Sequence, residues 1–232
     1  IGHIKRPITT FGISEGAMVQ AKNIKYIKSN SEFMLYSNNK KIGAINLNLP
    51  GKHNVLNALG AISIALELGV KFESIKSALK DYLGVRRRFE LKYTTMNNIK
   101  IIDDYAHHPA EVKATIDATK AGWNSRIISV FQPHLFTRTR DFYKDFSKSL
   151  LKSDIVIVTD IYPAREKPIK NVDSSMITKE LIKSGHENTH YIPDSLSLPI
   201  LIKKITCPND IILIMGAGNI WRICENIYNE IK

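Results

Sequence analysis

The amino-acid sequence predicts an α/β fold built on a mostly parallel sheet, and three observations support this. Residues 100–231 alternate short apolar runs with amphipathic stretches of helical period, five times in succession. The apolar runs are continuous, which is typical of parallel strands covered on both faces. The 232 residues are 44% apolar and 24% charged, a composition typical of a folded globular protein.

Residues 1–91 are expected to form a separate domain that begins with strands and turns. β-prone runs predict strands at residues 8–11, 33–36 and 42–47, and the turn residues Asn38 and Asn39 join the last two in a hairpin. Helical periodicity predicts helices over residues 53–68 and 72–83, which Gly69 and Gly84 end.

Residues 92–232 carry the five strand–helix alternations, and the domain boundary is placed within residues 89–99. The predicted strands cover residues 100–103, 126–131, 154–159, 190–192 and 211–215. The predicted helices cover residues 110–121, 140–151, 174–183, a stretch that ends near residue 204, and 219–231. In such sheets ligands bind beyond the carboxyl ends of the strands, so the loops after the strands are the places to search.

Composition excludes several classes of protein. No apolar run reaches the ~18 residues that a membrane span needs, so no membrane association is expected. Two cysteines, Cys207 and Cys224, are too few for a disulfide-stapled secreted module, and a reducing cytoplasm is the expected location. Neither cysteine has metal-ligand spacing, and no metal ligands are predicted. The sequence gives no indication of an oligomeric state.

The net charge of +11 is concentrated in the first 92 residues, which hold 15 Lys and Arg against 6 Asp and Glu. Such an excess suits a solvated basic face, nucleic acid or anionic small molecules such as nucleotides. No nucleic-acid-binding motif accompanies the charge, so nucleic acid is not expected as a partner.

The loop at residues 103–109 brings two carboxylates and two imidazoles between a strand and a helix. The exposed N–H groups of a helix start favour an anion, and a carboxylate there suits a ribose hydroxyl or a metal-bound water. The alternative is that Asp103 or Asp104 caps the helix while His107 and His108 lie on the surface. Adjacent histidines on one loop rarely chelate a metal together.

The loop at residues 131–141 places Arg138 and Arg140 at another helix start, where they would clamp a carboxylate or phosphate. The alternative is that they form ion pairs with Asp141 or Asp145. Residues 216–219 suit either a phosphate cradle or a tight turn, and residues 160–169 either a site or a solvated loop. The chain contains no Gly-x-x-x-x-Gly-Lys-[Ser/Thr] phosphate loop and no motif for a nucleophilic serine or cysteine.

Six motifs taken in order resemble those of the Mur ligases, over essentially the whole chain. They are Gly51-Lys-His-Asn-x-x-Asn-Ala, Arg87-Arg-Phe, Asp103-Asp-Tyr-Ala-His-His-Pro, Phe131-Gln-Pro-His-x-x-Thr-Arg-Thr-Arg, Asp160-Ile-Tyr-Pro-Ala-Arg-Glu and Gly216-Ala-Gly. The resemblance implies that residues 1–91 are the last part of a central ATP-binding domain, entered after its phosphate loop. Residues 92–232 would then be the Rossmann-like C-terminal domain of a ligase.

Within that family the motifs are most similar to those of members that add L-alanine to UDP-N-acetylmuramate in peptidoglycan synthesis. The resemblance implies ATP-dependent amide formation through an acyl phosphate, with ATP, UDP-N-acetylmuramate and L-alanine as the small-molecule partners. Mg²⁺ is implied as well, held mainly by residues of the preceding part of the chain, so this chain alone is expected to be inactive. The alternatives are a ligase that recycles a tripeptide onto the same sugar, against which Tyr105 weighs, and a non-catalytic nucleotide-binding remnant.

The resemblance also implies roles for individual residues. Those matching ATP-binding positions are His53, Asn54 and Asn57 at the adenine, Arg88 at the ribose and phosphates, and Asp104 at the ribose. Those matching the muramoyl-alanine end are His107, His108, His134 and Arg138, with His107, His108 and Arg138 as the catalytic candidates. Leu135 replaces an arginine of some members, and Asn219 replaces a frequent aspartate.

Overall fold

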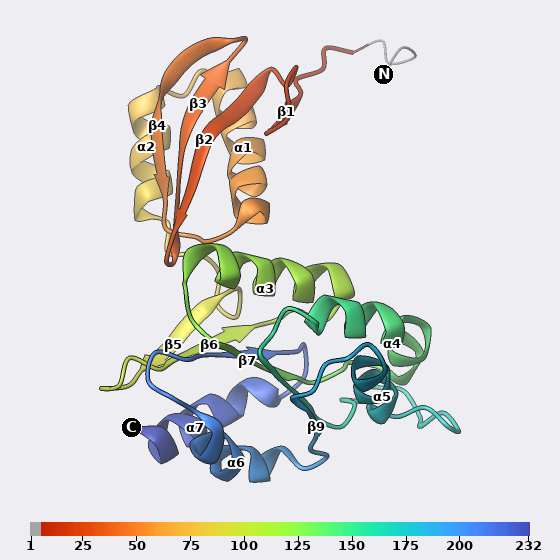
Figure 1. Cartoon of the computed structure of the whole chain (residues 1–232). Helices are drawn as coiled ribbons and strands as arrows, with labels where there is room; N and C mark the ends of the chain where they lie inside the picture. The colour runs from red at the N-terminus through yellow and green to blue at the C-terminus, as the bar shows by residue number, and fades with distance from the viewer. Residues whose placement is uncertain (1–5) are drawn as a thin grey trace. The chain divides into compact units, whose positions relative to one another are not determined.

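The computed structural model describes residues 6–232, which divide into two compact units between Gly84 and Val85 (Figure 1). Residues 121–123 group with the first unit. The division precedes the boundary predicted after residue 91, because β5 (Glu90–Thr94) pairs with a strand of the second unit.

The first unit contains a four-stranded sheet in the order β1-β2-β3-β4. Its strands are β1 (Phe11–Gly12), β2 (Val19–Ile27), β3 (Asn30–Ser37) and β4 (Lys40–Leu47). The predicted hairpin is present, since Asn38 and Asn39 both adopt positive φ between β3 and β4, as a two-residue turn of this kind requires. The strand predicted at residues 8–11 is limited to Phe11–Gly12, which pairs in parallel with β2.

Two helices complete the first unit, α1 (Lys52–Glu67) and α2 (Phe72–Asp81), close to their predicted limits. One face of the sheet packs against both helices through a buried core. This core consists of Val19, Ala21, Phe33, Leu35, Ile45, Val55, Leu59, Ile62 and Ile75.

The second unit is the predicted parallel sheet with one antiparallel edge strand. The strand order is β5-β6-β10-β7-β8-β9, and only β5 runs antiparallel to its neighbour. The strands beyond β5 are β6 (Lys100–Asp104), β7 (Ile127–Phe131), β8 (Ile155–Val158), β9 (Thr189–Tyr191) and β10 (Ile211–Met215).

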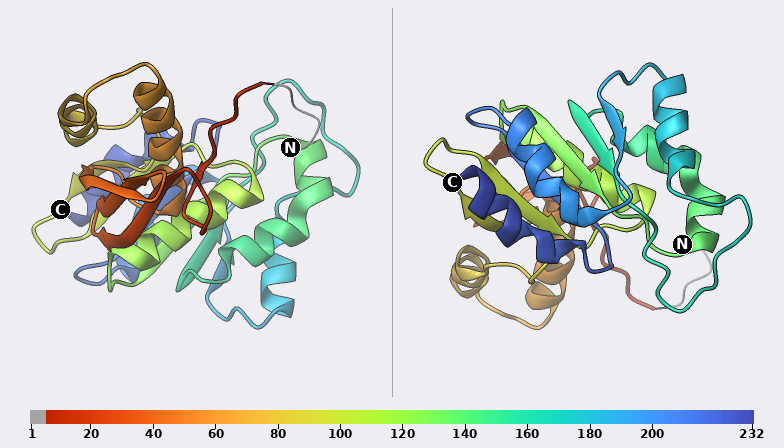
Figure 2. Two further views of the ribbon diagram at one scale, coloured as in Figure 1. Left: turned by 90° about the horizontal axis from the view of Figure 1, so that it is seen from above. Right: turned by 90° about the horizontal axis from the view of Figure 1, so that it is seen from below.

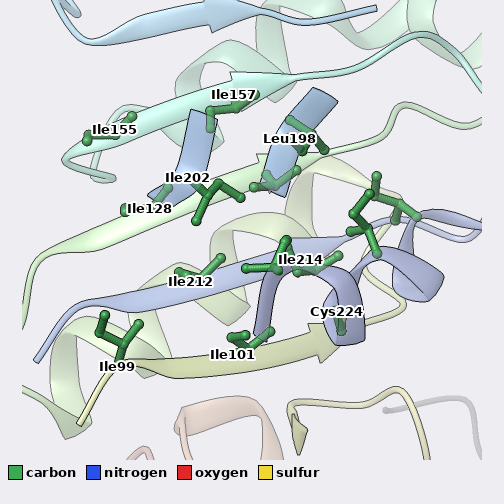
Figure 3. Packing of buried hydrophobic residues seen from close by; sticks show 14 residues of the cluster. Ile99, Ile101, Ile128, Ile155, Ile157, Leu198, Ile202, Ile212, Ile214 and Cys224 are labelled. Atoms are coloured by element: carbon green, nitrogen blue, oxygen red, sulfur yellow. The ribbon is translucent and has the colours of Figure 1, made fainter. Parts of the chain in front are cut away.

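Helices cover both faces of this sheet, as the continuous apolar runs predict (Figures 1 and 2). On one face lie α3 (Pro109–Gly122), α4 (Phe136–Leu150) and α5 (Ser175–Lys183). On the other face, α6 (Leu198–Ile205) and α7 (Ile223–Ile231) bury an isoleucine-rich core with β6, β7, β8 and β10 (Figure 3). No described helix is both long and apolar enough to cross a membrane.

α4 starts four residues before its predicted start at residue 140. Leu135 takes φ +72° as the N-cap residue, and the Glu166 carboxylate accepts the Thr137 N–H at 3.0 Å. A carboxylate on a free N–H group stabilises a helix start, so the helix is extended by a residue far away in sequence.

Candidate active site

Three loops leave the carboxyl edge of the second sheet side by side. Asp104, the last residue of β6, and Phe131, the last of β7, both pair with Met215 at the end of β10. Residues 105–108, 216–219 and 132–135 therefore begin at the same level of the sheet, where a ligand site is expected.

The two adjacent carboxylates point to opposite faces of the sheet, as successive strand residues must. Asp104 faces α3, where its Oδ2 accepts a hydrogen bond from Thr115 Oγ1 at 2.8 Å and its Oδ1 accepts one from Ala106 N–H at 2.9 Å. Burial raises the pKa of Asp104 to about 6, although these hydrogen bonds favour the ionised form. Because both oxygens have internal partners, the structure gives Asp104 a role within the loop.

Asp103 is buried on the other face and is paired with Arg87. Arg87 Nε lies 3.3 Å from Asp103 Oδ2, and Arg87 Nη2 donates to the Gly216 carbonyl at 2.8 Å. The same guanidinium lies over the ring of Tyr105, whose N–H donates to the Arg87 carbonyl. Burial raises the pKa of Asp103 despite this partner. Arg87 therefore links the loops after β6 and β10.

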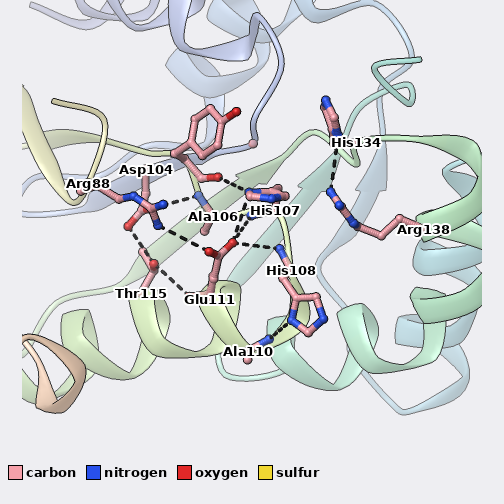
Figure 4. Close-up of polar contacts among 12 residues, drawn as sticks. Arg88, Asp104, Ala106, His107, His108, Ala110, Glu111, Thr115, His134 and Arg138 are labelled. Atoms are coloured by element: carbon pink, nitrogen blue, oxygen red, sulfur yellow. Dashed lines mark hydrogen bonds and ion pairs between the residues drawn. The ribbon is translucent and has the colours of Figure 1, made fainter. Parts of the chain in front are cut away.

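The start of α3 does not offer the free N–H groups expected for an anion. Glu111 Oε2 accepts the backbone N–H of His107 at 3.0 Å and that of His108 at 3.2 Å, with Pro109 in the first helical turn (Figure 4). A glutamate that returns to the helix start in this way is one half of a capping box. The expectation of an anion on this helix start is wrong, because the chain's own carboxylate occupies it.

His107 and His134, from two loops, lie near Arg138 in the first turn of α4. The rings of His107 and His134 lie 6.0 Å apart, centroid to centroid, and Arg138 Nη1 lies 3.4 Å from His134 Nδ1 (Figure 4). The Tyr162 ring stacks on the ring of His134 at 5.7 Å, and its backbone forms hydrogen bonds with Pro133 and Leu135. Burial, followed by the charges of Arg138 and His107, lowers the pKa of His134, so this imidazole is neutral at pH 7.

The other predicted charges in these loops have different surroundings. Arg140 forms an ion pair with its neighbour Asp141, which was the alternative for this arginine. Arg165 and Lys167 are exposed, as in a solvated loop, whereas Glu166 between them caps α4. His108 is exposed and lies against Phe142 of α4.

The glycine loop after β10 is explained by close packing. A Cβ on Gly218 would lie 2.3 Å from Gln132 Oε1, and one on Gly216 would lie 2.8 Å from the Gln132 carbonyl. The Gln132 side chain then donates to Asn219 Oδ1 and accepts the Ile220 N–H. Of the two explanations open from the sequence, the tight turn is the one with observed contacts.

The predicted ATP-binding residues lie in both units. In the first unit, Asn54 donates to the Pro50 carbonyl at 2.8 Å, Asn57 is exposed, and His53 lies in the first turn of α1. In the second, Arg88 is half-exposed and its Nη1 lies 3.4 Å from Glu111 Oε1. No group of three potential metal-ligand side chains occurs among residues 6–232.

Three residues of the site were not singled out from the sequence. Glu111 had a usable signal, because it is the third residue of a helix that begins at Pro109. Arg87 could not be separated from the arginines on either side of it. Tyr162 approaches His134 through an isolated bridge between distant loops, which no local pattern indicates.

Comparison with family models identifies both parts of the chain. The model described as "Mur ligase, glutamate ligase domain" matches residues 87–218, and the Mur ligase middle domain matches residues 2–65. The chain belongs to the Mur ligase family. The expected family resemblance and the α/β fold class are thereby confirmed.

Curated relatives are named UDP-N-acetylmuramate–L-alanine ligase. The protein from Salinibacter ruber is 38% identical over 97% of this chain and 47% of its own length. The protein from Pelodictyon phaeoclathratiforme is 42% identical over 97% of this chain and 48% of its own length. The chain thus spans about half the length of the curated relatives it matches.

Solved structures show the same similarity. The crystal structure of UDP-N-acetylmuramate-alanine ligase from Thermotoga maritima is 28% identical, with a TM-score of 0.79 over 95% of this chain and 47% of its own. The crystal structure of a murein peptide ligase from Psychrobacter arcticus is 25% identical, with a TM-score of 0.63 over 96% of this chain and 46% of its own.

Proposed function

We propose that this chain is the ATP- and amino-acid-facing part of a ligase that joins L-alanine to UDP-N-acetylmuramate, working in the cytoplasm in peptidoglycan synthesis. The observation that carries the proposal is the convergence of His107, His134 and Arg138 at the carboxyl edge of the sheet. The names of the relatives support the choice of substrates.

In this proposal Arg138 and His134 hold the carboxylate of the alanine end. A guanidinium has five N–H donors, and Arg138 uses one of them on His134, so others are available for a carboxylate. Positive charge at this point also stabilises the anion that develops during acyl transfer. ATP, when bound, supplies the phosphoryl group that activates the sugar carboxylate as an acyl phosphate.

The described residues fit ATP in part. The amide of Asn57 is exposed on α1 of the first unit, and Arg88 of the second unit is half-exposed, so each of these side chains is open to a ligand of its own unit. Each oxygen of the buried Asp104 already accepts a hydrogen bond within the chain, so the ribose contact that the resemblance implies would share one of these oxygens. Because residues 6–232 bring no three potential metal ligands together, no step of the mechanism is assigned to Mg²⁺ on these residues.

A chimaera tests the proposal. The part of the Salinibacter ruber ligase that precedes the matched half is joined to this chain, and phosphate release is measured with ATP, Mg²⁺, UDP-N-acetylmuramate and L-alanine. Release that needs all three substrates supports the proposal, and we expect no release from the 232-residue chain alone. Release with a tripeptide but not with L-alanine would indicate a recycling ligase, and a folded, inactive chimaera would count against ligase activity.

A further inference from the structure

Nδ1 of the His107 ring contacts two oxygen atoms, and both can only accept a hydrogen bond. Nδ1 lies 2.9 Å from the Tyr105 carbonyl oxygen and 3.2 Å from Glu111 Oε2. A carbonyl and a carboxylate only accept hydrogen bonds, so Nδ1 carries the proton. The lone pair of the neutral ring is then on Nε2, which makes no hydrogen bond within the part of the chain that the structure describes.

The neighbouring His134 has the opposite arrangement. Its Nδ1 faces Arg138 Nη1, and because a guanidinium only donates, Nδ1 must accept and the proton is on Nε2. The two facing imidazoles therefore present different groups. His134 offers an N–H donor beside a guanidinium, and His107 offers an acceptor.

We propose that Glu111 is a positioning residue that holds His107 in its Nδ1–H form, so that Nε2 accepts a proton from the α-ammonium group of the incoming amino acid. This rests on the proposed ligase function. The N–H bond of the ammonium breaks and its proton binds Nε2, which leaves the nitrogen lone pair free to attack the acyl phosphate. A C–N bond forms, the C–O bond to phosphate breaks with its electron pair leaving on phosphate, and the second amine proton leaves with that phosphate.

The charges around His107 suit this role. Glu111 belongs to α3, His134 and Arg138 face the ring from the loop after β7 and from α4, and Arg88 pairs with the other oxygen of Glu111. Burial alone would raise the pKa of Glu111, but the His107 N–H bond and the charges of His107 and Arg88 lower it. The carboxylate is therefore ionised at neutral pH and stabilises an imidazolium that forms beside it.

Helix capping alone does not account for this geometry. Glu166 caps α4 by accepting Thr137 N–H at 3.0 Å and Thr137 Oγ1 at 2.5 Å, and within residues 6–232 it makes no hydrogen bond to an imidazole. Glu111 accepts two backbone N–H groups and in addition faces His107 Nδ1. The two glutamates thus form a matched pair, and only one of them orients a histidine.

The first experiment measures the tautomer directly on the 232-residue chain and needs no activity. Two-bond ¹H–¹⁵N NMR correlations at pH 8 distinguish Nδ1–H from Nε2–H in ¹⁵N-histidine-labelled protein. We expect Nδ1–H for His107, a ratio of Nδ1–H to Nε2–H about 10-fold lower in Glu111→Gln, and no change in Glu166→Gln. Glutamine keeps an oxygen for the two backbone N–H groups, and circular dichroism confirms folding.

An Nε2–H ring in the wild type, or an unchanged ratio in Glu111→Gln, would overturn the positioning role. An equal change of the His107 tautomer ratio in Glu166→Gln would mean that the effect of Glu111 is that of any glutamate that caps a helix.

The second experiment uses the chimaera and tests the proton transfer. Glu111→Gln should lower kcat about 10-fold at pH 7 with the KM for ATP unchanged. The loss should shrink at high pH, where free alanine is already an amine. A loss that is equal at every pH would overturn the role of His107 as acceptor, whereas a wild-type chimaera that ignores L-alanine would instead refute the proposed function and leave the tautomer result intact.

Discussion

Asp104 should make the second unit less stable as the pH rises. Its pKa is about 6 in the folded chain against 3.8 for an aspartate exposed to water, a difference of about two. Below pH ~4 the carboxyl is protonated in both the folded and the unfolded chain, so its burial does not lower the stability. Above pH ~6 it is ionised in both. Each unit corresponds to 1.36 kcal/mol, so burial of the ionised group removes about 3 kcal/mol of stability across this range.

Asp104→Asn removes the titration and keeps an oxygen for the Ala106 N–H. The free energy of unfolding is measured from pH 4 to 7.5 in urea by the fluorescence of Trp221, with Trp123 replaced by Phe in every protein. Relative to the wild type, the variant should gain about 3 kcal/mol as the pH rises.

Asp117→Asn is the control of opposite sign. Burial raises the pKa of Asp117, but hydrogen bonds from Lys113 and Lys152 outweigh it and lower the pKa. This variant should therefore lose stability relative to the wild type as the pH rises. If the free energy of unfolding of the wild type and of Asp104→Asn changed in parallel with pH, Asp104 would not be the buried carboxyl that titrates.

Three further substitutions test the site. Arg87→Ala leaves a buried carboxylate without its cation and should cost about 3–5 kcal/mol in urea unfolding at pH 7, where a neutral effect would mean that the pair is not formed. Gly218→Ala places a methyl group against Gln132 and should cost about 1–3 kcal/mol by the same measurement, whereas no loss would show that the loop is loosely packed. Arg138→Ala should raise the KM for L-alanine or lower the kcat of the chimaera by about 10- to 100-fold. Arg140→Ala is the control and should change neither constant, because the Arg140 guanidinium is already paired with Asp141. Equal effects of the two substitutions would place both arginines outside the substrate site.

The sequence predicted those elements whose local pattern matches their environment. Residues 211–215 are apolar without interruption because β10 lies between two parallel strands with helices on both faces. β2 was missed because Lys22 and Lys25 interrupt its alternation around Asn23, which adopts φ +54° where the pairing with β3 shifts register. β5 was missed because it is an edge strand with a register shift of its own.

In the candidate site, too, the sequence could not predict contacts that depend on residues from other elements of the fold. Three consecutive arginines precede β5, and the positive φ of Arg87 accompanies its turn toward Asp103 while Arg88 stays half-exposed. Side-chain type predicted that histidines and an arginine would face a ligand. Which nitrogen of each ring donates depends on partners from other elements, so only the fold can assign it.

Two of the helices that start at this edge of the sheet, α3 and α4, carry their own anion. Glu111 occupies the start of α3 and Glu166 the start of α4, so neither helix start is free to bind a substrate phosphate or carboxylate. At these two loops, recognition of an anion must therefore come from side chains, and Arg138 lies there beside neutral His134. Arg138 lies beside His134, and His107 lies 6.0 Å from His134, ring centroid to ring centroid. This arrangement fits an amino acid, because the guanidinium and His134 offer donors to the carboxylate and His107 offers an acceptor to the ammonium group.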